Sequence, residues 1–239
     1  MPLTPHQHKQ IEVINTIAKQ VSVNALNFST VAPVEDYEND SRICLTSVHI
    51  PNQKLINQVS TLTQPLRAIE PDFFYYPNDS LHLTVKNVRV INDPPHFDEN
   101  DIEKAQRVFS SVIPRHHQYQ IYFYRLLLFP NNLALIGTTD PELDNIVLDL
   151  DEAMKKANVP DDKIYANTRY FFSNMTLVRF SSQPSQAFRE QVLKLSESIQ
   201  FEPYLVDSVT LLSCNAVFKK QREIGTWQLQ PSKMYNHHS

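Results

Sequence analysis

One short strand pattern occurs twice in this chain and constrains the fold more than any other feature. Residues 81–85 have the sequence Leu-His-Leu-Thr-Val, and residues 173–177 have the sequence Ser-Asn-Met-Thr-Leu. Side chains alternate between the two faces of a β-strand. The apolar residues of each motif are therefore predicted to face a core, while the two polar residues lie side by side on the other face. The motifs match position for position, except that Asn174 stands where the first motif has His82.

The order of predicted elements also repeats around the two motifs. Strand, helix, motif strand, helix and strand follow one another over residues 42–128, and the same order returns over residues 133–214. Internal duplication of this kind constrains the architecture. We therefore predict an α+β fold with two pseudo-symmetric βαβ-type lobes, whose antiparallel sheets face a central cleft. Small-molecule sites usually lie in such clefts.

The ends of the chain lie outside this repeat. A helix over residues 5–21 has an apolar stripe at helical spacing, and we expect this stripe to dock on the body rather than on a partner. An acidic linker follows at residues 35–40. The predicted segments are an N-terminal helical extension with its linker (1–41), a two-lobed body (42–232, with halves of roughly 42–130 and 131–232) and a frayed tail (233–239).

Proline and capping residues set several predicted boundaries. A helix through residues 55–62 is predicted to end before Pro65, because proline lacks the backbone N–H that a helix interior requires. The next helix is predicted to be capped by Asn100 or Asp101. Residues 204–214 are predicted to form one continuous strand.

Glycine, cysteine and charge exclude several classes of protein. With only 2 glycines, the chain contains neither a Rossmann fingerprint nor a P-loop, since both need several glycines in one turn. Cys44 and Cys214 lie far apart, so no disulfide framework is predicted and a reducing, cytoplasmic compartment is expected. The net charge of -4 restricts any nucleic-acid site to a local basic patch. The N-terminus lacks a signal-peptide pattern, and no apolar run approaches the roughly 18 residues of a membrane span, so no membrane association is expected.

The polar face of the first motif suits anion binding and proton transfer. An unperturbed imidazole titrates at about pH 6.5, so His82 can move a proton, and the Thr84 hydroxyl beside it can hold an anion. Asn174 can donate or accept a hydrogen bond, but its amide exchanges no proton near neutral pH. By alternation, Lys86 is predicted on the face of His82 and Thr84. Arg179 adds a second cation if it points inward rather than to solvent.

Aromatic residues near the motifs can stack on a nucleobase, which contributes about 1–3 kcal/mol per base. Tyr170 and Phe172 share the face of Asn174 by alternation, and Tyr124 lies on the long strand before the second motif. Packing in the core is the alternative for each of these rings.

The two motifs resemble those of the two-histidine phosphoesterase superfamily, which includes RNA 2′,3′-cyclic phosphodiesterases and bacterial 2′-5′ RNA ligase-like proteins. The first motif looks like the family's first motif without change. The second family motif is usually Pro-His-x-Thr-Leu-x-Arg. Here Thr176, the Leu after it and Arg179 match, while Ser173 and Asn174 replace the Pro and the His. The similarity of element order covers about residues 42–229.

The resemblance implies a phosphodiesterase that uses no metal and no cofactor and acts on a nucleotide or an RNA end with a 2′,3′-cyclic or 2′-linked phosphate. In the family, two histidines serve as general acid and general base, and two threonines hold the phosphate oxygens. Losing one histidine of the pair is expected to raise the barrier by roughly 3–5 kcal/mol. The implied catalytic residues are His82, Thr84 and Thr176, and the implied ligand contacts are Asn174, Arg179, Lys86, Tyr170, Phe172 and Tyr124.

The asparagine in the second motif leaves three outcomes open. His82 acts alone in a slow phosphodiesterase, another residue replaces the lost histidine, or the site binds a phosphorylated ligand without turnover. For replacement, His49 is the candidate, with an ordinary surface position as the alternative. We expect a weakened enzyme, with a catalytically inactive binding module as the alternative, and a monomer. Three pairs of histidines lie close together in the sequence, at residues 6 and 8, 116 and 117, and 237 and 238. None has a Cys or a carboxylate at ligand spacing, so no metal site is predicted.

Overall fold

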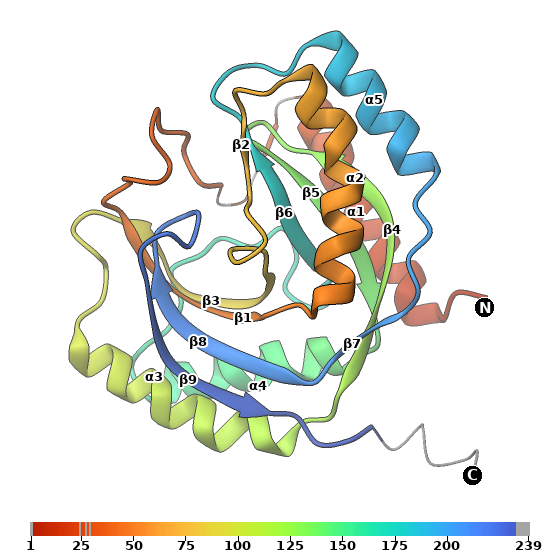
Figure 1. Cartoon of the computed structure of the whole chain (residues 1–239). Coiled ribbons are helices and arrows are strands. Elements are labelled where there is room, and N and C mark those ends of the chain that lie inside the picture. Colours follow the sequence, from red (N-terminus) through yellow and green to blue (C-terminus); the bar gives the residue numbers. More distant parts are fainter. Residues whose placement is uncertain (1, 24, 27, 29, 233–239) are drawn as a thin grey trace.

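Two antiparallel sheets face each other in the middle of the molecule, and helices cover them (Figure 1). The computed structural model describes residues 2–23, 25–26, 28 and 30–232, so the predicted tail at 233–239 lies outside the described residues. The first sheet consists of β3 (Leu83–Asn92), β1 (Ile43–His49), β8 (Ser208–Cys214) and β9 (Gln221–Gln228), in that order. The second sheet consists of β2 (Phe74–Tyr75), β6 (Ser173–Arg179), β5 (Asn132–Thr139), β4 (Tyr119–Leu128) and β7 (Tyr204–Val206), in that order. The helices are α1 (Pro5–Ser22), α2 (Gln53–Ile69), α3 (Glu99–Val112), the 3-10 turn η1 (Ile113–Arg115), α4 (Glu142–Lys156) and α5 (Gln186–Glu197).

The two sheets exchange strands between the halves of the sequence. β4 joins the second sheet because the short connection at residues 129–131 folds it back onto β5. β8 and β9 return to the first sheet, where β8 pairs with β1. The predicted division near residue 130 therefore does not separate the two sheets. Strands joined by a tight connection become neighbours, whichever half of the repeat they come from.

The strand predicted over residues 204–214 is in fact two strands. Asp207 separates β7, which pairs with β4 in the second sheet, from β8 in the first sheet. The carbonyl of Asp207 accepts a hydrogen bond from the backbone N–H of Leu229, at 2.8 Å, where the chain changes sheet. A short bend of this kind lets one continuous segment contribute to both sheets.

Two predicted helix boundaries are wrong for local reasons. α2 continues through Pro65 to Ile69. Pro65 is exposed, so water can satisfy the backbone carbonyl that loses its partner. α3 begins before the predicted caps, because the Asp98 carboxylate accepts a hydrogen bond from the backbone N–H of Asp101 at 2.9 Å. None of the helices in the described ranges is long and apolar enough to cross a membrane.

The apolar residues of both motifs enter one large core. α2 and α5 cover the outer face of the second sheet, and α3 and α4 cover the outer face of the first (Figure 1). Leu83, Met175 and Leu177 are all buried in this core, as alternation predicts. The polar residues between them are consequently turned toward the space between the sheets.

The N-terminal helix docks on the inner face of the second sheet. Its boundaries agree with the predicted helix, and a capping box formed by Thr4 and Gln7 begins it. Ile14 packs in one apolar cluster with Ala134 of β5. Ala134 pairs in register with Thr176 of the second motif. Gln10 is fully buried, and its side-chain amide accepts a hydrogen bond from the backbone N–H of Thr139 at 2.8 Å. The extension is thus part of the body and covers some of the face that carries the second motif.

Candidate functional site

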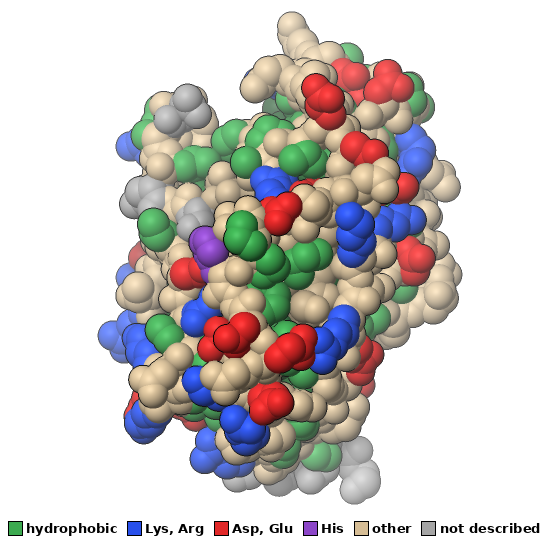
Figure 2. Space-filling model, turned by 90° about the vertical axis from the view of Figure 1, so that its left-hand side faces the viewer, with side chains coloured by type: hydrophobic (Ala, Val, Ile, Leu, Met, Phe, Trp, Pro, Cys, Tyr) green, Lys and Arg blue, Asp and Glu red, His purple; other side chains and the backbone are tan. Residues whose placement is uncertain are grey.

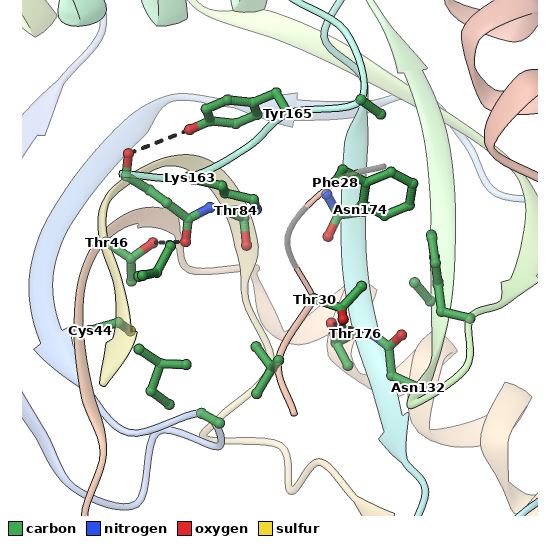
Figure 3. Close-up of a pocket in the computed structure, with 18 of the residues that line it drawn as sticks. Phe28, Thr30, Cys44, Thr46, Thr84, Asn132, Lys163, Tyr165, Asn174 and Thr176 are labelled. Atoms are coloured by element: carbon green, nitrogen blue, oxygen red, sulfur yellow. Dashed lines mark hydrogen bonds between the residues drawn. The ribbon is translucent and has the colours of Figure 1, made fainter. Parts of the chain in front are cut away.

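A cavity of about 510 Å³ opens between the two sheets, and the polar residues of both motifs line it. His82 and Thr84 enter it at the start of β3, and Asn174 and Thr176 enter it from β6. Figure 3 shows Thr84 on one side of the cavity and Asn174 with Thr176 on the other. The structure thus brings the two motifs to one cleft, as the repeat predicts.

His82 is a buried imidazole that lines the cleft. Its Nδ1 lies 2.8 Å from the carbonyl oxygen of Ser80. A carbonyl only accepts, so Nδ1 carries the proton and Nε2 keeps its lone pair. The ring stacks on Phe218 with centroids 3.8 Å apart and meets Tyr76 edge-on at 5.9 Å. Burial, and the nearby Arg179 cation to a lesser extent, lower the pKa of His82 to about 4, so at neutral pH it is a proton acceptor.

Arg179 is a buried guanidinium at the end of β6, and it lines the cleft. Its Nε donates to the hydroxyl of Tyr76 at 2.9 Å, and its Nη2 donates to the carbonyl of Ala216 at 3.3 Å. Within the described ranges, no carboxylate lies within 4.0 Å of it. A buried cation without an anionic partner is costly. Arg179 therefore points inward, as the anion-binding interpretation requires, and provides positive charge near His82.

The second side of the cleft is polar, with Asn174 at the position where the first motif has His82. Asn174 pairs in register with Ile136, and Thr176 accepts a weak hydrogen bond from the Asn132 amide at 3.4 Å. Figure 3 shows Phe28 of the N-terminal extension beside Asn174. This side can hold an oxygen atom by hydrogen bonding, but its amides cannot give or take a proton near neutral pH.

Lys86 does not lie where alternation predicts it. Thr84 pairs with Val48 of β1, and Lys86 pairs with Ser47, the adjacent residue of β1. Val85 therefore has no partner of its own and is the extra residue of a β-bulge. An extra residue reverses the faces of all residues beyond it. Lys86 is consequently buried away from the cleft in an ion pair with Asp161, and Asn87 lines the cavity in its place. The prediction that Lys86 shares the face of His82 is wrong.

The other predicted residues divide between the cleft and the core. Tyr170 and Phe172 line the cavity. Tyr124 is absent from the residues that line it and packs instead in the cluster under α1. His49 is buried rather than exposed, with its ring nitrogens 2.9 Å from the Tyr204 hydroxyl and from a backbone carbonyl. It does not line the cleft, so it does not supply a second histidine there.

The loop between α4 and β6 supplies a lysine to the cleft that sequence reasoning missed. Lys163 lies beside Thr84 and Tyr165 in Figure 3, with its amine 5.4 Å from the Tyr165 ring centroid. Burial, together with the charge of Lys86, lowers the pKa of Lys163 to about 8. No local pattern in the sequence marks this residue, because the loop has no periodicity and reaches the cleft only through the fold.

The loop between β8 and β9 supplies Phe218, the ring that supports His82. Phe218 has a φ of 63°, a left-handed conformation that side chains other than Gly, Asn and Asp rarely adopt. The fully buried Asn215 holds this loop, because its side-chain oxygen accepts from the backbone N–H groups of Lys219 at 3.0 Å and Lys220 at 3.2 Å. Strain of this kind persists when surrounding contacts determine the conformation, as they do here.

No family model and no curated protein matches this sequence. Among solved structures, E. coli LigT in its apo form has a TM-score of 0.54 at 13% identity, with coverage of 80% of this chain and 99% of LigT. LigT complexed with 3′-AMP has a TM-score of 0.52 at 13% identity, with the same coverage. A conserved protein of unknown function from Agrobacterium tumefaciens, ATU0111, has a TM-score of 0.57 at 13% identity, with coverage of 87% of this chain and 97% of its own.

These likenesses establish the fold of the chain. A further match, a crystal structure described as a phosphoesterase, has a TM-score of 0.50 at 15% identity and is covered over 99% of its length. The two-lobed arrangement of helices and antiparallel sheets is therefore the one found in LigT and in the structure described as a phosphoesterase.

Proposed function

We propose that this protein, which has the fold of the two-histidine phosphoesterases, binds the phosphate of a nucleotide or an RNA end in the cleft between its sheets. The ligand carries a 2′,3′-cyclic or 2′-linked phosphate, and the protein cleaves it slowly, with His82 as the general base. The observation that carries this proposal is the neutral His82, whose Nδ1 is bound to the Ser80 carbonyl, in the same cavity as the buried Arg179 and the two motif threonines.

The residues of the cleft suit a phosphate group chemically. Thr84 and Thr176 approach from opposite sides, so their hydroxyls can donate to two non-bridging oxygens of one phosphate. Arg179 and Lys163 add positive charge where the negative charge of the phosphate develops, which is the main electrostatic need of phosphoryl transfer. A bound anion also favours the imidazolium form of His82 and thus raises the basicity of His82 when the site is filled.

A single histidine limits the rate of the proposed reaction. His82 can take the proton from an attacking water, but Asn174 on the opposite side cannot give one to the leaving oxygen. A matched acid or base typically contributes about 10²–10⁴ in rate. Lys163 lies on the same side as Thr84, so it strengthens anion binding without taking the place of Asn174. We therefore expect turnover slower than that of an enzyme with both histidines by about that factor.

The surface around the cleft favours a short ligand. Figure 2 shows acidic and basic side chains interspersed over the face that lies on the left in Figure 1, with hydrophobic side chains gathered toward its centre. The described side chains on this face form no continuous basic track for a long nucleic acid. Tyr170 and Phe172 line the cavity, and either ring can stack on a base next to the phosphate.

A binding module without turnover is the second candidate. The observation that favours it is the position of Phe28 beside Asn174 and of Thr30 beside Thr176 (Figure 3). This N-terminal segment occupies space next to the second motif, where the leaving group of a phosphodiester must depart. In this version the cleft holds the phosphate group of the same ligand without cleaving it.

A turnover assay separates the two candidates. The protein is incubated with nucleoside 2′,3′-cyclic phosphates and short 2′-5′-linked oligonucleotides in the presence of a chelator, and products are separated by chromatography. Turnover that His82→Ala abolishes and His82→Gln does not restore supports the enzyme, since glutamine keeps a hydrogen-bonding group but transfers no proton. Calorimetric binding without turnover in long incubations supports the binding module. Neither binding nor turnover, with the fold confirmed by circular dichroism, contradicts both.

A further inference from the structure

Two thiols face each other on the floor of the cleft. Cys44 of β1 and Cys214 of β8 are direct register partners on neighbouring antiparallel strands, and their sulfur atoms are 3.6 Å apart. The Cys44 thiol also lies 3.2 Å from the carbonyl oxygen of Cys214, to which it donates when protonated. Cys44 is partly exposed and lines the cavity, whereas Cys214 is fully buried behind it. The pair therefore has one sulfur that a small molecule can reach and a second within immediate reach of the first.

The surroundings of the pair favour a thiolate at Cys44 and a thiol at Cys214. The hydrogen bond from the Cys214 thiol lowers the pKa of Cys44 despite its burial, and the Arg179 cation lowers it further. Lys163 also interacts electrostatically with Cys44. The sulfur therefore has two cationic side chains in its surroundings, Arg179 from β6 and Lys163 from the loop between α4 and β6. Burial raises the pKa of Cys214, which therefore keeps its proton. Reactive cysteines are found in electropositive, partly exposed places of this kind, and redox-sensitive ones stand next to a second cysteine.

We propose that Cys44 and Cys214 form a reversible oxidation site, in which a hydroperoxide oxidises Cys44 and Cys214 then closes a disulfide between β1 and β8. The oxidation chemistry does not require the proposed phosphoesterase activity, because it uses neither His82 nor the motif threonines.

The two steps balance as follows. The Cys44 thiolate attacks the terminal oxygen of the hydroperoxide, the O–O bond breaks, and the leaving oxygen takes a proton to form an alcohol or water. Cys44 is now a sulfenic acid. The Cys214 sulfur then attacks the sulfur of Cys44 and loses its proton, while hydroxide leaves and is protonated to water. Two thiols are oxidised by two electrons, and one hydroperoxide is reduced.

The geometry of the strands allows the bond with a small movement. A disulfide requires about 2.05 Å between sulfurs, so the two atoms must approach by roughly 1.5 Å, which side-chain rotation and a slight strand shift can supply. Cys214 packs with Leu212, Val48 and Phe218. Phe218 is the ring on which His82 stacks, so oxidation alters the packing directly beneath the proposed catalytic base.

The test uses the full chain, freshly reduced and freed of reductant, with hydrogen peroxide as the probe. We expect both thiols to become unreactive to a thiol reagent in denaturant, the intact mass to fall by two hydrogens, and a dithiol reductant to reverse both changes. Peptide mapping must then show a Cys44–Cys214 link. Persistence of both thiols under conditions that fully oxidise free glutathione overturns the proposal.

Two single variants assign the roles of the sulfurs. In Cys214→Ser, Cys44 is expected to stop at the sulfenic acid, which a cyclic 1,3-diketone traps. In Cys44→Ser, Cys214 is expected to stay reduced in the folded protein, because it is buried and has a raised pKa. Equal peroxide reactivity of the two variants contradicts the assignment. If either serine variant fails to fold by circular dichroism, the wild-type mass and mapping measurements still decide the proposal.

Discussion

The two motif sides of the cleft have the same strand pattern but different surroundings. His82 and Thr84 stand on a side that retains a proton acceptor, supported by the Phe218 ring and the Ser80 carbonyl. Asn174 and Thr176 stand on a side that retains only hydrogen-bonding groups and lies next to the N-terminal extension. The repeated pattern thus gives both sides of the cleft a threonine, while only one of the two motifs has an imidazole.

The difference between the two sides suggests that the groups that bind an anion and the groups that transfer a proton need not be distributed in the same way within one pseudo-symmetric site. In the proposed site, the threonine hydroxyl of each motif positions the phosphate, whereas full acid–base chemistry needs a titratable group on each side of it. Changes that equalise the two sides, or that widen the difference between them, therefore test the interpretation most directly.

Asn174→His makes the two sides alike and is expected to have the largest effect. A histidine at this position can protonate the leaving oxygen, so the rate of cleavage of a nucleoside 2′,3′-cyclic phosphate should rise by about 10²–10⁴. Initial rates of product formation measure it. The matched control is the double variant Asn174→His, His82→Ala, which should lose the gain. An unchanged rate in a folded Asn174→His protein would show that the second side no longer has a catalytic geometry.

Removing the charge of Arg179 tests how much this residue contributes to anion binding in the cleft. Arg179 belongs to the strand of the second motif, but it contacts Tyr76, which packs against His82. A hydrogen bond to a charged group contributes about 1.5–3 kcal/mol, so Arg179→Gln is expected to weaken binding of inorganic phosphate roughly 10- to 100-fold by calorimetry.

Two further variants serve as controls for Arg179→Gln. Arg179→Lys keeps the charge and should lose less affinity than Arg179→Gln. Arg107→Gln removes a charge from α3, where the side chain is 67% exposed and away from the cavity, and should leave phosphate binding unchanged. If Arg107→Gln weakens binding as much as Arg179→Gln, the effect reflects net charge rather than the site.

The burial of His82 predicts a smaller effect, on stability rather than on rate. The pKa of His82 is about 4 in the folded protein and about 6.5 in an unfolded chain. Between these values only the unfolded chain binds the proton, so this contribution is fully present above about pH 6.5 and is lost as pH falls through 4. One pKa unit corresponds to about 1.4 kcal/mol, so the whole shift amounts to roughly 3 kcal/mol.

Urea unfolding at pH 7 and at pH 4.5 measures this effect. The free energy of unfolding should fall more in the wild-type protein than in His82→Gln, which has no imidazole to protonate. His96→Gln serves as the control, because the His96 side chain is 51% exposed and its loss should not change the pH dependence in this way. Equal pH dependence of wild type and His82→Gln would mean that His82 is not held neutral by burial.

Much of the fold was predictable because the determining signals are local. Alternation placed Leu83, Met175 and Leu177 in the core and the polar motif residues on the opposite face, which the burial of these residues confirms. The long strand over Tyr119–Leu128 and the N-terminal helix were predicted closely, since both have clear periodicity and turn or capping residues at their ends. These features depend on neighbours a few residues apart in the chain.

The rest of the site depends on contacts between distant segments. The bulge at Val85, which turns Lys86 away from the cleft, arises in the pairing of β3 with β1. Lys163 reaches the cavity from a loop without periodicity, and Phe28 reaches it from an extension whose sequence shows only that it docks somewhere. Local sequence patterns do not indicate which segments that are distant in the chain will come into contact.

By itself, the sequence determined the repeat, the alternation of its two motifs and the difference between them, His82 in the first and Asn174 in the second. Only the tertiary structure decided which face Lys86 occupies, how deeply His82 is buried and that Cys44 meets Cys214. The physical reason is the range of the interactions. Strand alternation follows from the covalent geometry of successive residues, whereas strand register, burial and pKa follow from segments that only folding brings together.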